Sequence, residues 1–466
     1  MHNKIQHRAS AVALAGIVTA ISLAASNPAF AAATAEEIKQ LGTTLTPWGA
    51  EKAGNKEGTI PAYTGPIKPP ANYNPAKPGI RPDPFAAEKP LFSIDAKNAD
   101  KHADKLSEGM KQMFKKYPTF RMDIYQSHRT ATYPQFVLDN TLKNASQCKT
   151  AGDGLQLVNC FAGFPFPFPK TGNEVMWNRL WKYDAQNLES DGMAGRVVDI
   201  NGNTTLTGIG KMWIHYPIYD PKKTTPVALN EPYEKIRIDF TDPARKAGEK
   251  LIILDPVDMV NSGRKAFSYL PGQRRVKLAP DISYDTPSPT GGGAGNVDEA
   301  AVWYGSLDRY NFKLIGKKEM YIPYNAYRIR DASECPSKIS MKTKNHLNPD
   351  CMRWELHRVW MVEATLKEGK RNAYTKRTLY WDEDLPGVGM SDNYDSTGAI
   401  YRISHSIPIT LYETQAHSTD EWVTYDLATG NYSRQQDVTD SGGWIVTPSK
   451  PSDFFSSEGL AGSGVR

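Results

Sequence analysis

Hydrophobic and polar residues alternate through most of the chain after about residue 196. A period of two is typical of β-strands with one buried face. The pattern predicts strands at 204–216, 233–240, 250–255, 266–278, 301–315, 319–329, 352–366, 374–383, 400–412 and 421–435. Helical patterns of 10–15 residues do not separate these stretches, which argues against a Rossmann or TIM-barrel architecture.

Helical periodicity is confined to the first part of the chain. Apolar residues spaced by three and four predict an amphipathic helix at 99–116 that Pro118 ends, and a second, shorter helix is predicted at 138–145. A short strand is expected at 120–125. Helices followed by about ten antiparallel strands predict a β-dominated α+β fold. We expect a large curved antiparallel sheet that wraps around helices and is closed by them.

A run of alternating phenylalanine and proline, residues 164–169, precedes a tryptophan-rich helix. Proline fixes φ and lacks a backbone donor, so the run must be extended and cannot be an interior strand. Thr171 or Asn173 can cap the helix that follows, with Glu174 in its first turn. The helix is too apolar all round for a surface position. We interpret the Phe-Pro run and this helix as a lid or, equally, as part of the core.

The N-terminus has the pattern of a secretory signal peptide. Lys4 and Arg8 precede an apolar run at 11–25, and a small-residue cleavage site ends near Ala31. No cysteine follows this site, so a lipid anchor is not expected, and the mature chain shows no membrane span. Without Lys4 and Arg8 the formal charge falls from +5 to +3, which gives no case for nucleic acid binding.

The predicted domain organisation follows the composition. We expect a signal peptide at 1–31, a proline-rich extended segment at 32–97 that packs on the body, one domain at 98–450 and a tail at 451–466. Aromatic residues in the proline-rich segment are potential anchors: Trp48, Tyr63, Tyr73, Phe85 and Phe92.

Four cysteines lie in the mature chain as two local pairs, Cys148 with Cys160 and Cys335 with Cys351. Four cysteines allow three connectivities. In an oxidising compartment two short-loop disulfides are the simplest arrangement, each worth about 2–4 kcal/mol. The spacing does not match a zinc site, so structural disulfides are favoured over metal ligands.

Catalytic motifs are weak. The chain has no HExxH, GxSxG or phosphate-binding GxxxxGK[ST] motif, and the glycine-rich run 291–295 follows a Pro-Ser-Pro-Thr stretch, which predicts a flexible loop. Glu355 and His357 share a strand face that we expect to be solvated rather than metal-binding.

Asp382, Glu383 and Asp384 form the best acidic cluster. A glycosidase would need two such carboxylates across a cleft, but capping a turn or pairing with arginine is the favoured interpretation; the candidate arginines are Arg274, Arg275 and Arg377. No cofactor or metal is expected.

The aromatic content is high, with 10 tryptophans and 23 tyrosines. A curved sheet with an aromatic inner face would enclose a cavity for an apolar ligand, with the Trp177 helix as its gate. A large aromatic core without a cavity is the alternative. The residues predicted to line the cavity or its lid are Phe166, Phe168, Trp177, Trp181, Trp213, Tyr269, Trp303, Trp360, Tyr380 and Trp422.

Several long motifs resemble an exported bacterial family, domain of unknown function 1329. They are LGTTLTPWGAEKAGNKEGTIPAYTG (41–65), DPFAAEKPLFSIDAKNADKHADKLSEG (83–109), RMDIYQSHRTATYP (121–134), GFPFPFPKTGNEVMWN (163–178), YLPGQRRVKLAP (269–280) and LYWDEDLP (379–386). The resemblance implies an incomplete barrel like that of the lipoprotein-sorting proteins LolA and LolB, around an apolar cavity. It also implies the periplasm of a Gram-negative bacterium and partnership with an exporter of the resistance-nodulation-division type and an outer-membrane protein.

Together these features predict a non-enzymatic periplasmic carrier or accessory protein that binds a lipid or another hydrophobic molecule. A ligand-free scaffold that links the exporter to its outer-membrane partner is the first alternative. A carbohydrate- or lipid-active hydrolase that uses Asp382 and Asp384 is the second.

Overall fold

The structure is a computed structural model that describes residues 33–462. The predicted signal peptide at 1–31 lies outside the described residues. Among residues 33–462, no helix has both the length and the apolar character needed to cross a membrane.

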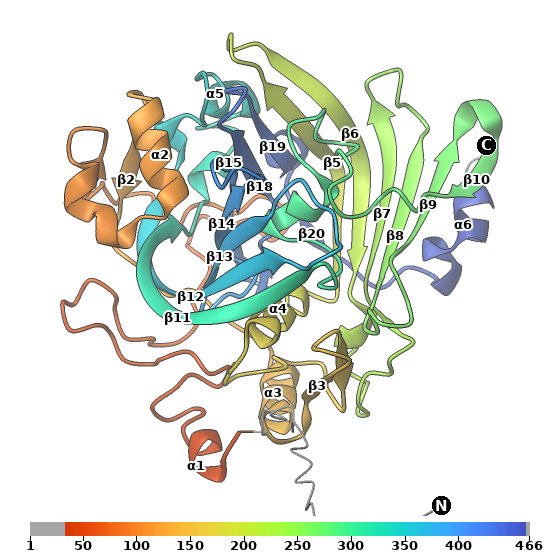
Figure 1. Cartoon of the computed structure of the whole chain (residues 1–466), viewed down its shortest axis with the longest axis horizontal. Coiled ribbons are helices and arrows are strands. Elements are labelled where there is room, and N and C mark those ends of the chain that lie inside the picture. The colour runs from red at the N-terminus through yellow and green to blue at the C-terminus, as the bar shows by residue number, and fades with distance from the viewer. Residues whose placement is uncertain (1–32, 463–466) are drawn as a thin grey trace, which may run out of the picture. The chain divides into compact units, whose positions relative to one another are not determined.

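One large sheet dominates the fold (Figure 1). Its 16 strands follow the order β1-β2-β12-β13-β14-β15-β18-β19-β5-β6-β7-β8-β9-β10, with β11 beside β12 and β20 beside β5. Neighbouring strands are antiparallel, except that β12 and β2 pair in parallel at a single position. In the part of the chain that the structure describes, β1 and β10 stand at opposite ends of this order. The sheet is therefore strongly curved but not closed into a barrel, as the sequence predicted.

The strands fall into two blocks along the chain. The first block is β5 (Asn187–Val198), β6 (Thr204–His215), β7 (Pro232–Asp242), β8 (Lys250–Pro256), β9 (Lys265–Leu270) and β10 (Arg275–Leu278). The second is β11 (Tyr310–Pro323), β12 (Trp354–Leu366), β13 (Lys376–Asp382), β14 (Gly389–Tyr394), β15 (Ile400–Ser406), β18 (Trp422–Asp426), β19 (Tyr432–Asp437) and β20 (Ile445–Val446). Shorter strands are β1 (Phe92–Ile94), β2 (Met122–Ile124) and the separate pairs β3 (Lys149–Ala151) with β4 (Gln156–Val158) and β16 (Ile409–Leu411) with β17 (Ala416–Ser418).

Each predicted strand stretch contains a strand, but some boundaries are wrong. The stretches 266–278 and 421–435 are hairpins of two strands, β9–β10 and β18–β19. The first part of 301–315 is not a strand, because a 3₁₀ helix occupies Val297–Val302 and β11 begins only at Tyr310. Ala301 and Val302 have φ of 46° and 74°, in the left-handed region that interrupts an extended chain.

The helices are few and short. They are α1 (Ala35–Ile38), α2 (Glu108–Lys116), α3 (Gln135–Gln147), α4 (Gly172–Leu180), α5 (Ser337–Ser340) and α6 (Ser457–Gly462). The predicted helix at 99–116 is divided into a 3₁₀ helix at Ala99–Lys105 and α2. Ser107 caps α2. Thr171, one of the two predicted caps, forms a capping box with Glu174 at the start of α4. Helix α4 is buried and packs on β11 and β12.

The Phe-Pro run lies buried between α3 and α4. Its prolines cannot donate hydrogen bonds, so asparagine side chains of the helices satisfy the remaining backbone groups. The side chain of Asn178 accepts from the Phe166 N–H at 3.0 Å and donates to its carbonyl at 2.8 Å. The side chain of Asn144 donates to the Phe164 carbonyl at 2.9 Å. These bonds fix the run to both helices.

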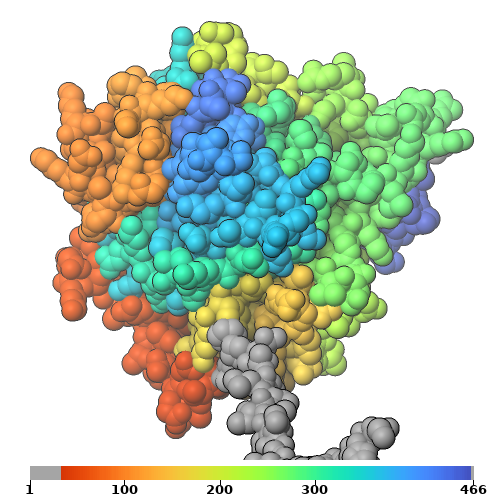
Figure 2. Space-filling view, viewed as in Figure 1, coloured from red at the N-terminus to blue at the C-terminus, as the bar shows by residue number. Residues whose placement is uncertain are grey.

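Residues 33–90 run over the surface of the body with little regular structure (Figure 2). Trp48 is buried, and its ring packs edge-on against Tyr63 and Tyr133. Farther along, Tyr73 packs on Tyr412, and Phe85 stacks on His128. Phe92 remains exposed. Aromatic side chains at intervals therefore attach this segment to the body.

Two disulfides join Cys148 to Cys160 and Cys335 to Cys351, which confirms the local pairs. The first closes the β3–β4 loop next to the Phe-Pro run. The second closes a loop within the long connection between β11 and β12.

Candidate functional site

An apolar cavity lies between one face of β5–β8 and residues 279–304, which we call the covering segment. Its volume is about 70 Å³. Strands β5–β8 line it with aliphatic and methionine side chains, β18 and β19 add Trp422 and Gln436, and the covering segment contributes the rest. The lining residues are Met193, Met212, Ile236, Ile238, Leu251, Ile253, Ile282, Ser288, Pro289, Thr290, Val297, Ala300, Tyr304, Trp422 and Gln436.

The alternation of the strands produces this lining directly. Residues two apart on a strand share a face, so Ile236 and Ile238 point the same way from β7. In the register of the sheet, Ile238 lies opposite Met212 on β6 and opposite Leu251 on β8. A row of large apolar side chains thus crosses three neighbouring strands at one level. The row forms the floor of the cavity.

Polar contacts along its length hold the covering segment on the sheet. Asp298 lies 3.6 Å from Arg377, and Glu299 pairs with Arg402 at 3.2 Å. Two further side chains bind backbone carbonyls at 289–290. The Thr207 hydroxyl donates to the Thr290 carbonyl, and the Lys246 ammonium donates to the Pro289 carbonyl. The glycine-rich run predicted to be a flexible loop lies next to these contacts. Gly292 has φ of +55°, and a Cβ there would stand 2.6 Å from Thr207 Cγ2, so only glycine fits this approach.

The predicted aromatic site residues mostly lie elsewhere. Trp422 is the one member of that set among the residues that line the apolar cavity. Trp177, Trp181 and Trp303 are fully buried in the core, and the Trp177 indole donates to the Gly154 carbonyl at 2.7 Å. The remaining members take other positions. Phe166 and Trp360 line a second, very small gap, Phe168 is half-buried, Trp213 packs on Phe454, Tyr269 joins a small cluster with Leu460, and Tyr380 donates to Asp392.

Sequence reasoning missed the aliphatic floor because it weighted tryptophan and tyrosine. The signal was available as the alternating Ile236 and Ile238 and the continuous apolar run at 251–254, both in predicted strands.

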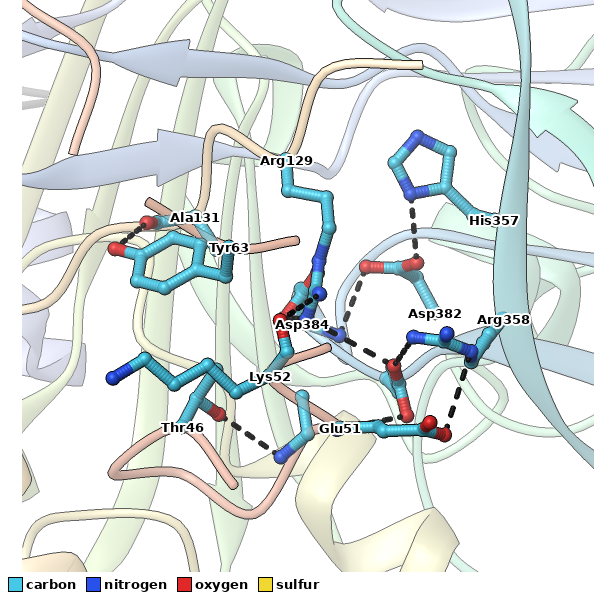
Figure 3. A network of polar contacts seen from close by, with 12 residues as sticks. Thr46, Glu51, Lys52, Tyr63, Arg129, Ala131, His357, Arg358, Asp382 and Asp384 are labelled. Carbon is cyan, nitrogen blue, oxygen red and sulfur yellow. Dashed lines mark hydrogen bonds and ion pairs between the residues drawn. The ribbon is translucent and has the colours of Figure 1, made fainter. Parts of the chain in front are cut away.

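A buried carboxylate cluster forms a second candidate site at the end of β13 (Figure 3). Arg129 makes a bidentate pair with Asp384, with Nε to Oδ2 at 2.7 Å and Nη2 to Oδ1 at 2.9 Å. Glu383 pairs with Lys317 at 2.5 Å and with Arg358 at 3.4 Å. Asp382 Oδ1 accepts from the N–H groups of the following turn. The expectation of turn capping and arginine pairing is thus met.

The predicted arginine partners of this cluster were wrong. Arg274 and Arg275 are exposed at the β9–β10 turn, and Arg377 lies 3.6 Å from Asp298 instead. The cluster also binds the N-terminal segment. The Trp48 indole donates to Asp384 at 3.2 Å, and Arg129 donates to the Lys52 carbonyl at 3.2 Å. These partners come from distant parts of the chain, so no local pattern could identify them.

The expectation of a solvated face for Glu355 and His357 is wrong, because both side chains are buried. His357 Nε2 lies 3.1 Å from Glu355, and Arg353 pairs with Glu355 at 2.6 Å. Burial by itself would raise the pKa of Glu355, but the His357 hydrogen bond and the Arg353 charge outweigh it and lower the pKa to about 2. Burial and the neighbouring Asp384 raise the pKa of Asp382 well above its usual value.

The space at the carboxylates is too small for a sugar. The gap lined by Trp48, Asp382 and Glu383 measures about 10 Å³, roughly the space of one water molecule. One ligand atom each of His357, Asp382 and Asp384 lies within 4.8 Å of the others, the one such group of three found among the described residues. However, both oxygens of Asp384 already accept from Arg129, whose positive charge opposes a cation there. The arrangement is that of a structural clamp.

The family model of the proteins of unknown function DUF1329 matches residues 93–461. The chain belongs to this family. The DUF1329 match covers β2–β20 and all but the first residue of β1. It includes both candidate sites, except the contacts that the N-terminal segment makes with the carboxylate cluster.

One curated relative is the uncharacterized protein PA3922 of Pseudomonas aeruginosa, 38% identical over 419 residues, or 89% of this chain and 90% of the relative. Among solved structures, a candidate outer membrane lipoprotein-sorting protein domain from Vibrio parahaemolyticus is similar with a TM-score of 0.41 and 11% identity, covering 62% of this chain and 97% of that one. A DUF1329 family protein from Desulfovibrio piger is similar with a TM-score of 0.38 and 14% identity, covering 59% and 92%.

Proposed function

We propose that this protein is a non-enzymatic carrier in the periplasm of a Gram-negative bacterium that binds a lipid or another hydrophobic molecule. The observation that carries the proposal is the apolar cavity between the floor of β5–β8 and the covering segment. An aliphatic floor suits an alkyl chain, since burying each methylene group of the chain contributes about 0.8 kcal/mol to the binding free energy. The signal-peptide pattern of the N-terminus supports export to the periplasm.

The covering segment has the features of a lid in this proposal. A cavity of about 70 Å³ is smaller than the roughly 150 Å³ in which an engineered apolar cavity holds benzene. A longer chain therefore requires residues 287–292 of the covering segment to move. Two side-chain contacts to backbone carbonyls and a glycine-rich run are compatible with such a movement, whereas Asp298 and Glu299 anchor the following residues through buried ion pairs. Met193 and Met212 in the floor are flexible side chains that adapt to different occupants.

Binding of a fluorescent fatty acyl probe tests the proposal. Ala300 lines the cavity, so Ala300→Phe fills it with an aromatic ring without changing the charge. Ala247→Phe places the same ring at an exposed position and is the matched control. We expect wild-type protein and Ala247→Phe to bind the probe alike, and Ala300→Phe to bind it at least tenfold more weakly with unchanged circular dichroism. Equal binding by all three would exclude this cavity as the site.

The two alternatives make different predictions. A scaffold without a ligand would bind no acyl probe and would still associate with a resistance-nodulation-division exporter or an outer-membrane protein. A hydrolase based on Asp382 and Asp384 would turn over a carbohydrate or lipid ester and lose that activity in Asp382→Asn. We favour the carrier because Asp384 is paired with Arg129, Asp382 caps a turn, and the cluster adjoins only a water-sized gap, whereas the apolar cavity offers space lined by apolar side chains.

A further inference from the structure

A second cavity lies beside the apolar one, and its lining is polar. Its volume is about 230 Å³, and Tyr304 lines both cavities. Along β8, Leu251 and Ile253 line the apolar cavity, and Asp255 lines the polar one. Successive residues on one face of a strand are about 7 Å apart. The two cavities are therefore consecutive spaces along the same face of the sheet, under the same covering segment.

Three polar atoms in this cavity lack a partner. The hydroxyls of Tyr233 and Tyr304 and Oδ1 of Asp298 are buried and make no hydrogen bond within residues 33–462. Tyr233 is 2% exposed and Asp298 is 4% exposed. A buried polar atom without a partner costs about 1–3 kcal/mol, and native proteins satisfy nearly all of them. Three in one cavity indicate that a molecule in the cavity supplies their partners.

The charges around the cavity are already balanced. Arg264 makes a bidentate pair with Asp255 at 2.7 and 2.8 Å, and its guanidinium lies 4.0 Å from the centre of the Tyr304 ring. The other oxygen of Asp298 accepts from Asn372 at 2.8 Å. Burial raises the pKa of Tyr233 and of Tyr304, so both hydroxyls remain protonated donors. An anionic group would meet three carboxylates here, those of Asp255, Asp298 and Asp308, and a cationic group would meet Arg264.

We infer that the polar cavity holds the hydroxyl-bearing, uncharged head of an amphiphile whose alkyl chain occupies the apolar cavity. A hydroxyl both donates and accepts, so it can donate to Asp298 and accept from Tyr233 or Tyr304. This inference rests on the proposed carrier function and names the class of molecule carried. Ordered water is the competing occupant of the polar cavity. A preference of the protein for ligands with a hydroxyl-bearing head distinguishes a bound head group from water.

Displacement of the fluorescent acyl probe by three ligands with the same chain tests the inference; dodecanoate supplies the anionic head. Glycerol monododecanoate has the hydroxyl-bearing head, and methyl dodecanoate has the same chain without it. Tyr233→Phe and Tyr304→Phe remove only hydroxyls that have no partner, so both variants should fold at least as stably as wild type. Tyr327→Phe is the control, because its hydroxyl donates to the Thr410 carbonyl at 2.8 Å and lines neither cavity.

We expect wild-type protein to bind the glycerol ester about tenfold more tightly than the methyl ester, the effect of one or two net hydrogen bonds. Tyr233→Phe and Tyr304→Phe should each lower the affinity for the glycerol ester about fivefold and leave the affinity for the methyl ester unchanged. Tyr327→Phe should change neither affinity. Equal affinities in every variant would mean that water fills the polar cavity; this result would overturn the inference and leave the carrier function intact. A preference for dodecanoate would overturn the assignment of an uncharged head. Binding of neither ester would overturn the proposed function itself.

Discussion

The pair between Arg129 and Asp384 should be essential for stability, and its removal tests whether the carboxylate cluster is a clamp. Both side chains are 2% exposed. Arg129→Met leaves Asp384 buried without its bidentate partner, which costs about 3–5 kcal/mol of unfolding free energy. Arg129→Met combined with Asp384→Leu removes both charges and should recover most of that loss, since apolar replacements of buried pairs are often neutral.

Urea unfolding followed by tryptophan fluorescence measures these free energies. Arg328→Met is the matched control, because Arg328 pairs with Glu334 where the side chains are 46% and 50% exposed. Exposed ion pairs contribute about 0–1 kcal/mol to the unfolding free energy, so the control should barely shift the urea concentration at the unfolding midpoint. If Arg129→Met costs no more than the control, or if the double variant is as unstable as the sum of the singles, the clamp interpretation is refuted.

Two further predictions concern protonation and the covering segment. Burial lowers the pKa of His417 to about 4, and its Nε2 accepts from the Thr132 N–H at 3.3 Å. A depressed histidine pKa contributes stability that is present above pH 6.5 and is lost as pH falls toward 4, so lowering pH from about 8 to about 5 should cost about 2 kcal/mol of unfolding free energy through His417 alone. His405, whose pKa burial also lowers to about 4, adds to the loss of the whole protein. His417→Gln should lose less over this range, and an equal loss would contradict the assignment. Separately, Thr207→Val removes the bond to Thr290 and should accelerate amide exchange at 287–296 several-fold; unchanged exchange would show that the contact does not hold the segment.

The sequence predicted the class of fold well because β alternation is a local signal. Strands such as β7 and β12 carry a period of two over most of their length, so their existence follows from neighbours in the chain. The interruption at Ala301 could not be foreseen in this way. Its left-handed conformation is imposed by packing of the covering segment on the sheet, and alanine has no intrinsic preference for it.

The candidate sites were harder to predict because they depend on pairings across long separations. Arg129 and Asp384 are 255 positions apart, and nothing near either residue indicates the other. Buried charges such as Glu355 have the local pattern of a solvated strand face. Arg353 is only two residues away, but the His128 N–H and the Asn325 side chain reach Glu355 from distant segments, and together these contacts offset the cost of burying its charge. In contrast, the capping box at Thr171 and the local disulfides involve short separations, and both were predictable.

The central claim is that the native protein carries a hydrophobic molecule, and solvent extraction followed by mass spectrometry tests it most directly. Mature protein should be purified from its native periplasm without detergent, in parallel with Ala300→Phe and Ala247→Phe. The account predicts a stoichiometric hydrophobic molecule with an uncharged hydroxyl-bearing head in wild type and Ala247→Phe, and its loss in folded Ala300→Phe. Wild-type protein that is recovered empty, and that remains empty when offered lipids, would contradict the account.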